Sequence, residues 1–185
     1  MGRSIPLSGH AAPAGGFEVP LEMLSACHHR IERQCATLRR LVAHLATRGA
    51  DADARAAAQA VLRYFDTAAP DHHADEEADL FPALIESMAG SDARCIRDLT
   101  NALTRDHRAI DAAWRPLHAA LQSVAAGDPE PLTAAQVDPF IALQERHLAL
   151  EERELLPMAQ RLLGDDALQQ IGQAMRQRRG IPAPD

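Results

Sequence analysis

Two short stretches of this sequence place a histidine one helical turn before a glutamate. The first contains His72 and Glu76, and the second contains His147 and Glu151. Residues four apart lie on the same face of a helix, so each stretch offers an imidazole and a carboxylate to one common partner. A neutral imidazole and a carboxylate are ligands that first-row transition metals accept. Two copies of the pair predict two metals, or one site with internal symmetry.

The two stretches belong to a longer internal repeat. An offset of 75 relates the following pairs: Phe65 and Phe140, His72 and His147, Glu76 and Glu151, Glu77 and Glu152, Leu80 and Leu155, Pro82 and Pro157. An offset of 79 relates His28 to His107, and the difference fits an insertion in a connecting loop. Each half therefore reads as a helical hairpin that carries one histidine on its first helix and the His-x-x-x-Glu pair on its second.

The histidines share a face with the apolar residues of their helices. His28 follows Leu24 by four residues and precedes Ile31 by three, and His107 has the same relation to its own apolar neighbours. Four imidazoles and two carboxylates are thus expected to point into a core. Buried polar groups without partners cost several kcal/mol each, and a bound metal centre removes that cost.

Long amphipathic segments must position these groups. Apolar residues recur at helical spacing, and Gly, Pro and capping residues mark the ends. The expected helices are 20–47, 51–88, 92–125, 133–164 and 165–178. The fold class predicted is all-α, an up-down-up-down four-helix bundle with a short C-terminal fifth helix. The bundle is expected over residues 18–180, with tails at 1–17 and 181–185. Pro70 is expected to kink or break the second helix just before His72.

Composition excludes several classes of function. The net charge is −7, so neither nucleic acid nor an anionic membrane is an expected partner. No apolar run is long enough to span a bilayer, and no secretory signal is recognisable. The three cysteines show no CxxC spacing and fit buried thiols in a reducing compartment. We therefore expect a cytoplasmic protein, and the sequence leaves its oligomeric state open.

The order His, His-x-x-x-Glu, His, His-x-x-x-Glu resembles the hemerythrin family in its HHE cation-binding branch. The residues LFP and LLP after the two glutamates are similar as well, and the resemblance covers about residues 21–163. It implies two Fe ions joined by an oxo or hydroxo bridge, with other divalent metals possible in vitro. The implied assignment gives His28 and His72 to one iron, His107 and His147 to the other, and makes Glu76 and Glu151 bridges.

Counting ligands leaves room for a small molecule. Two roughly octahedral metals have about twelve positions, of which four histidines, two bridging carboxylates and a bridging oxygen fill about ten. The oxygen carriers of the family have a histidine where this chain has Asp111, which argues against reversible oxygen carriage. His73 is a candidate for an additional ligand, and the alternative is that it lies about 100° around the helix from His72 and ligates nothing.

Other residues near the repeat have weaker interpretations. Glu32 and Asp111 are candidates to accept a hydrogen bond from a ligand imidazole, with solvated or interhelical pairing as the alternative. Glu77 and Glu152 are expected at the surface or in caps, with metal ligation as the alternative. Tyr64 is expected at the edge of the core, with contact to a metal as the alternative.

The sequence leaves the class of activity open. The first hypothesis is a non-haem di-iron protein that binds or senses O2, NO or peroxide, or protects against stress. The second is a di-iron enzyme that decomposes peroxide or reduces NO. Iron donation or repair of iron–sulfur clusters ranks third, and a structural zinc bundle fourth. The expected partner in the first two cases is a small diatomic ligand or peroxide.

Overall fold

The computed structural model describes residues 16–182, except 88–92 and 129–131, and this part of the chain is helical with no strands. The helices are as follows: α1, Pro20–Arg48; α2, Ala52–Asp75; α3, Phe81–Ser87; α4, Ala93–Ala126; α5, Ala134–Leu150; α6, Leu156–Leu162; α7, Asp165–Arg178. The all-α class and the helix ranges predicted from the sequence are confirmed within a few residues. None of the described helices is long and apolar enough to cross a membrane.

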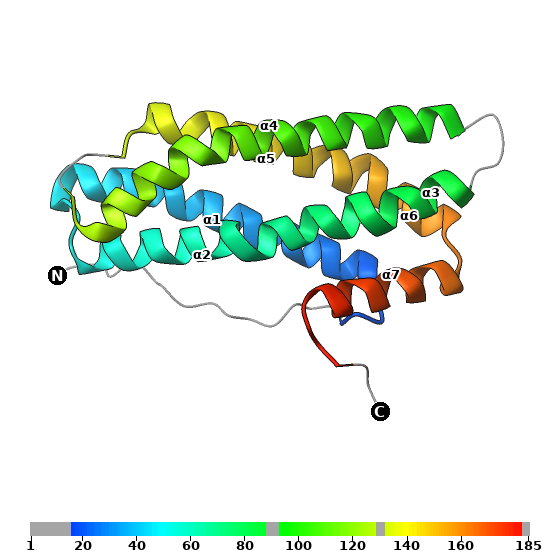
Figure 1. Cartoon of the computed structure of the whole chain (residues 1–185). Coiled ribbons are helices and arrows are strands. Elements are labelled where there is room, and N and C mark those ends of the chain that lie inside the picture. The colour runs from blue at the N-terminus through cyan, green and yellow to red at the C-terminus, as the bar shows by residue number, and fades with distance from the viewer. Residues whose placement is uncertain (1–15, 88–92, 129–131, 183–185) are drawn as a thin grey trace.

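Four long rods lie side by side and form a bundle (Figure 1). α1 packs against α2 and α5, and α4 packs against the same two helices on the other side. α3 continues the line of α2, and α6 continues the line of α5, so each of these rods consists of two helices. α7 lies outside the rods, on the flank of the bundle beside the start of α1 (Figure 1), and it contacts α1, α2 and η1.

The apolar core consists of two clusters. One contains Ile31, Ile110 and Phe140, and the other contains Leu24 and Leu103. Along α1 and α4, the boundary between the clusters falls at the expected ligand histidines, because these histidines lie between Leu24 and Ile31 and between Leu103 and Ile110. The polar centre is therefore enclosed by apolar packing on both sides along the bundle.

Helix ends follow the signals in the sequence. Gly49 ends α1 with a φ of 68°, which is in the left-handed region that glycine adopts without strain. Asp51 caps α2 by accepting a hydrogen bond from the Ala54 amide at 3.0 Å. At the start of α5, the Gln136 side chain accepts a bond from the Thr133 amide at 2.9 Å, as its predicted capping box requires. The turn expected at Gly90 and Ser91 lies outside the described residues.

Each two-part rod contains one π-helical turn. These turns are η1, Glu76–Leu80, between α2 and α3, and η2, Glu151–Leu155, between α5 and α6. Of the two outcomes expected at Pro70, the break does not occur, because α2 is continuous through Pro70 and the irregular turn comes after the histidines, and the kink stays a prediction. A π turn inserts one residue into a helix and occurs frequently at functional sites. Both turns begin at the glutamates predicted to bridge the metals.

The N-terminal part of the described chain packs on α7. The expected tail, 1–17, lies outside the described residues except for Gly16 and Phe17. Phe17 packs against the apolar cluster that contains Leu24 and Leu103. The Arg176 guanidinium lies over the Phe17 ring, 4.8 Å from the ring centroid. A Cβ at Gly172 would lie 2.0 Å from the Phe17 carbonyl oxygen, so this close approach requires glycine. Of the expected C-terminal tail, residues 183–185 also lie outside the described part.

Candidate metal centre

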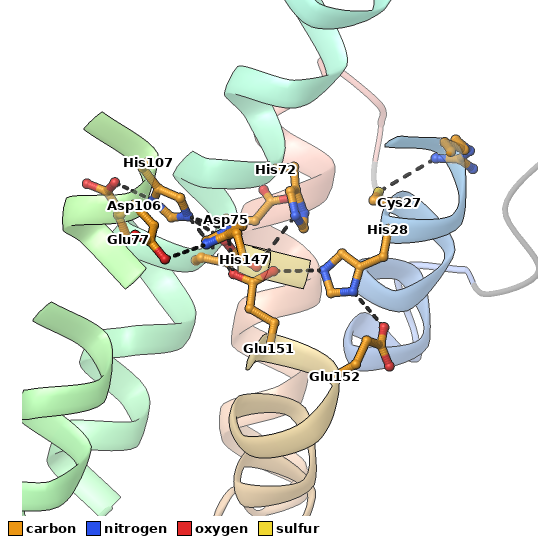
Figure 2. A network of polar contacts seen from close by, with 12 residues as sticks. Cys27, His28, His72, Asp75, Glu77, Asp106, His107, His147, Glu151 and Glu152 are labelled. Carbon is orange, nitrogen blue, oxygen red and sulfur yellow. Dashed lines mark hydrogen bonds and ion pairs between the residues drawn. The ribbon is translucent and has the colours of Figure 1, made fainter. Parts of the chain in front are cut away.

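Seven side chains meet between the two apolar clusters, and they are the seven that the sequence singles out. They form three overlapping groups in which the ligand atoms lie within 4.8 Å of one another. The groups are as follows: His28, His72, Glu76 and Glu151; Glu76, His107, His147 and Glu151; His73, His107 and His147. Figure 2 labels five of these side chains, and they come from four rods and point toward one another: His28, His72, His107, His147 and Glu151. The structure thus brings all the candidates together, and their ligation itself remains a prediction.

The Glu151 carboxylate lies between two histidines of different helices. Its Oε2 is 3.2 Å from Nε2 of His28, and its Oε1 is 2.9 Å from Nε2 of His147. Glu151 follows His147 by four residues and so lies on the same inner face, at the point where the π turn begins. One carboxylate therefore faces both sides of the centre with separate oxygens.

Glu76 has the corresponding position in the other half of the repeat. Its Oε1 is 3.6 Å from Nε2 of His72, and its Oε2 is 3.2 Å from Nε2 of His107. Both glutamates therefore connect the side that contains His28 and His72 to the side that contains His107 and His147. This division of the histidines is the one that the sequence resemblance implies.

The donor atoms at this centre fit a metal better than they fit one another. Five of the seven are fully buried and have side-chain atoms with no hydrogen-bond partner, including both oxygens of Glu76 and of Glu151. Nε2 of His107 and Nε2 of His147 lie 3.1 Å apart. Since buried polar groups are ordinarily satisfied, this many unpaired acceptors around one point indicates a site for cations.

Burial and mutual contact shift the acidities of these groups. Burial and the nearby Glu151 carboxylate raise the pKa of Glu76 well above its usual range. Burial and the neighbouring His28 lower the pKa of His72 far below its usual range. At His28, burial lowers the pKa, but contact with the Glu151 and Glu152 carboxylates outweighs it and raises the pKa to about 9. In the absence of a metal, His28 is therefore protonated at neutral pH while His72 is neutral.

Two further carboxylates fix the orientation of ligand imidazoles. Glu152 Oε1 lies 2.6 Å from Nδ1 of His28, and Glu77 Oε1 lies 2.6 Å from Nδ1 of His107. A carboxylate that accepts the outer N–H of a histidine sets which nitrogen faces the metal and strengthens the imidazole as a ligand. Arg108 in turn binds Glu77 at 2.8 Å.

The sequence offered Glu32 and Asp111 for this role, with solvated or interhelical pairing as the alternative, and both residues are exposed in the structure. Glu32 lies instead 3.3 Å from the exposed His29, and Asp111 lines a small cavity beside Trp114. Glu77 and Glu152 were expected at the surface or in caps, but they hold His107 and His28. The signal that identifies them is present in the repeat, because both directly follow a bridging glutamate in equivalent positions.

His73 lies on the His107 side of the centre. Its ring is stacked on that of His107, with centroids 4.0 Å apart and an interplanar angle of 15°. Burial and the neighbouring His107 lower the pKa of His73 to about 3, so its ring is neutral at neutral pH and has one unprotonated nitrogen that is able to bind a cation. The position one residue after His72 thus reaches the centre, although it lies around the helix from that residue.

Aromatic side chains pack on the side of the centre that faces the larger apolar cluster, which contains Ile31 and Ile110. The Phe65 ring lies 4.9 Å from that of Trp114 and 5.1 Å from that of Phe140. Phe65 and Phe140 are buried in the larger apolar cluster, and Trp114 is partly buried against it. Tyr64 donates a hydrogen bond to the Cys27 carbonyl oxygen at 3.3 Å, so its hydroxyl is tied to α1.

The comparisons with known proteins agree with this arrangement. The profile of the hemerythrin HHE cation binding domain matches residues 19–159. An uncharacterized protein of Haemophilus influenzae is 31% identical over 162 residues, which cover 88% of this chain and 91% of that protein. The matched region contains all the residues of the centre. The chain therefore belongs to the hemerythrin HHE cation-binding family.

Proposed function

We propose that this protein holds a binuclear non-haem iron centre and binds a small diatomic ligand or peroxide there. In this proposal His28 and His72 hold one iron, and His107 and His147 hold the other. The observation that carries the proposal is that Glu76 and Glu151 each direct one oxygen to either side. That is the geometry expected of bridging carboxylates in an up-down-up-down four-helix bundle.

The two sides of the centre differ in the number of ligands they offer. The His28 side has two imidazoles and two carboxylate oxygens, whereas the other side gains His73 as a third imidazole. With an oxo or hydroxo bridge and roughly six positions per metal, about one position is left open. We propose that it lies on the His28 side and that O2, NO or peroxide binds there.

The choice of iron rests on the chemistry of the donors. Imidazole and carboxylate together suit iron, and other divalent metals are expected to enter in vitro. Zinc in a structural role prefers a closed set of four ligands, which a centre with shared carboxylates and an open position does not provide. Asp111 still argues against reversible oxygen carriage, so we favour sensing or protection against stress. A cytoplasmic location remains a prediction from the sequence.

One feature favours a di-iron enzyme as the second candidate. Glu152 holds His28, and its side chain is 43% exposed, so it connects an imidazole of the centre with solvent. A carboxylate in that position is able to exchange protons with water during turnover of peroxide or NO. Iron donation to clusters has no comparable support.

The test is to expose the reduced, iron-loaded protein to O2, NO and peroxide separately, with optical spectra recorded and oxygen release measured. A stable new absorption band without gas evolution supports binding or sensing, whereas sustained oxygen release from peroxide supports the enzyme. His28→Ala should abolish either response. His29→Ala is the matched control, because His29 is the next residue but is exposed and contacts Glu32. A wild-type protein that responds to none of the three ligands contradicts the proposal.

A further inference from the structure

A buried carboxylate outside the proposed ligand set lies directly beside it. Asp75 is fully buried and immediately precedes Glu76 at the start of η1. The repeat has no counterpart, because the equivalent residue in the second half is Leu150. The metal ligands do not explain this acid, and an unpaired buried charge is strongly unfavourable.

The partners of Asp75 come from the end of α7. Arg179 contacts both oxygens, with Nη2 2.6 Å from Oδ2 and Nη1 3.1 Å from Oδ1. Arg178 also binds Asp75, and its Nη2 reaches Asp79 in the same π turn at 2.7 Å. Bidentate arginine–carboxylate pairs are strong and fix geometry. Two arginines therefore tie the C-terminal helix to the backbone that carries Glu76.

α7 is an addition to the repeated hairpins. It follows both halves of the repeat, and it begins beyond the region that matches the family profile, residues 19–159. It is nevertheless firmly docked, since Ile171 and Met175 are buried in the apolar cluster that contains Leu24, and the helix contacts α1, α2 and η1. A rigid support of this kind is able to hold the π turn in one position.

We propose that α7 is a positioning element for the metal centre: Arg179, assisted by Arg178, holds Asp75 and thereby fixes the adjacent Glu76 where it connects both metals. This inference rests on the proposed function, and it makes Arg178, Arg179 and Asp75 positioning residues. The first half of the repeat depends on an external support that the second half, with Leu150, does not have.

A double-mutant cycle tests the proposal through cobalt affinity, measured by competition of the apo-protein with a chelator. Arg179→Met and Asp75→Asn should each weaken binding about tenfold, as losses around metal ligands do. The double variant should bind about as weakly as either single one, because both remove the same contact. Arg176→Met is the matched control from the same helix, since Arg176 pairs with Glu18 at 2.7 Å instead, and it should bind like wild type.

The signs distinguish positioning from simple electrostatics. Removing a positive charge near a cation site should tighten binding, and removing a negative charge should weaken it. Tighter binding by the Arg179→Met variant therefore overturns the proposal, and so do losses that multiply in the double variant. Should Arg179→Met not fold, Arg179→Lys takes its place, because lysine retains the charge but loses the two-atom contact with Asp75. Its cobalt affinity is then compared with those of Asp75→Asn and of the double variant.

A metal-free measurement separates this inference from the proposed function. Amide hydrogen exchange over residues 76–80 of the apo-protein should be faster in Arg179→Met and unchanged in Arg176→Met. Equal exchange in the two variants overturns the proposal that Arg179 fixes the π turn through Asp75. If the wild-type protein binds neither cobalt nor iron but exchange responds as expected, the proposed metal centre is wrong and the positioning of the π turn by α7 is still supported.

Discussion

At the scale of single residues, the centre combines inner groups that face one another with outer groups that hold them in place. Glu152 shows the difference most clearly. It lies one residue after Glu151, yet it turns outward and accepts a hydrogen bond from His28. The bond with His28 is the leading cause that lowers the pKa of Glu152, so the carboxylate is ionised and its negative charge lies next to a ligand imidazole.

Loss of Glu152 should weaken metal binding without removing a ligand. Glu152→Ala is expected to lower metal affinity about tenfold, because His28 loses the acceptor that orients it. Competition of the apo-protein with a chromophoric chelator measures the change. Glu154→Ala is the control, since Glu154 is half exposed and pairs with Arg153. Equal affinities in the two variants contradict the role assigned to Glu152.

The sequence was sufficient to find the inner groups but not the outer ones. His28, His72, His107 and His147 lie in register with apolar stripes, so periodicity alone places them in the core. The partners of their outer nitrogens depend on how side chains turn at the edge of the bundle. That is why the sequence left the role of Glu32 and Asp111 open, whereas Glu152 and Glu77 make the contacts.

At the scale of elements, the π turns and α7 are the parts that a simple bundle lacks. Helical periodicity predicts continuous helices over 51–88 and 133–164, and both are interrupted by π turns that begin at Glu76 and Glu151. A π turn differs from an α turn by one inserted residue, which leaves hardly any trace in an apolar pattern. Pro70 predicts an irregularity before His72, whereas the irregular turn begins at Glu76, after that histidine.

The docking of α7 should depend on the size of one residue. Gly172→Ser is expected to destabilise the protein by about 1–3 kcal/mol, because a Cβ there would collide with the Phe17 backbone. Thermal or urea unfolding measures the change. Gly164→Ser is the same substitution at the start of the same helix, where a Cβ meets nothing within 4 Å, and serine suits an N-cap. A loss of stability in Gly164→Ser as large as in Gly172→Ser contradicts this account of the packing.

At the scale of the whole molecule, the two hairpins enclose buried histidines and glutamates whose cost depends on pH and on a bound metal. The repeat predicted from the sequence brings the two His-x-x-x-Glu pairs together in space, and this juxtaposition is confirmed. The sequence shows that the symmetry is incomplete, because Leu148 and Leu150 stand at the positions equivalent to His73 and Asp75, but it does not show what the two unmatched residues contact. His73 and Asp75 belong to the first half alone, and the structure places one at the centre and the other under α7.

The metal-free protein should lose stability as the pH rises above neutrality. The pKa of His28 is raised from 6.5 to about 9, so its pairing stabilises the fold fully below pH 6.5 and is lost as the pH passes 9. The raised pKa of Glu76 acts in the same direction. We expect a loss on the order of 3 kcal/mol between pH 6.5 and 9, measured by urea unfolding after chelation. His28→Gln should show a smaller loss, and a wild-type stability that does not change over this range contradicts the account.

The most direct test of the central claim is the iron content of the protein as purified from cells supplied with iron. The account predicts about two irons per chain, since two carboxylates between two sets of histidines make a binuclear site. His28→Ala should lower that number, while His29→Ala should not. Wild-type protein that holds no metal, or a single ion that survives the loss of His28, would contradict the binuclear centre.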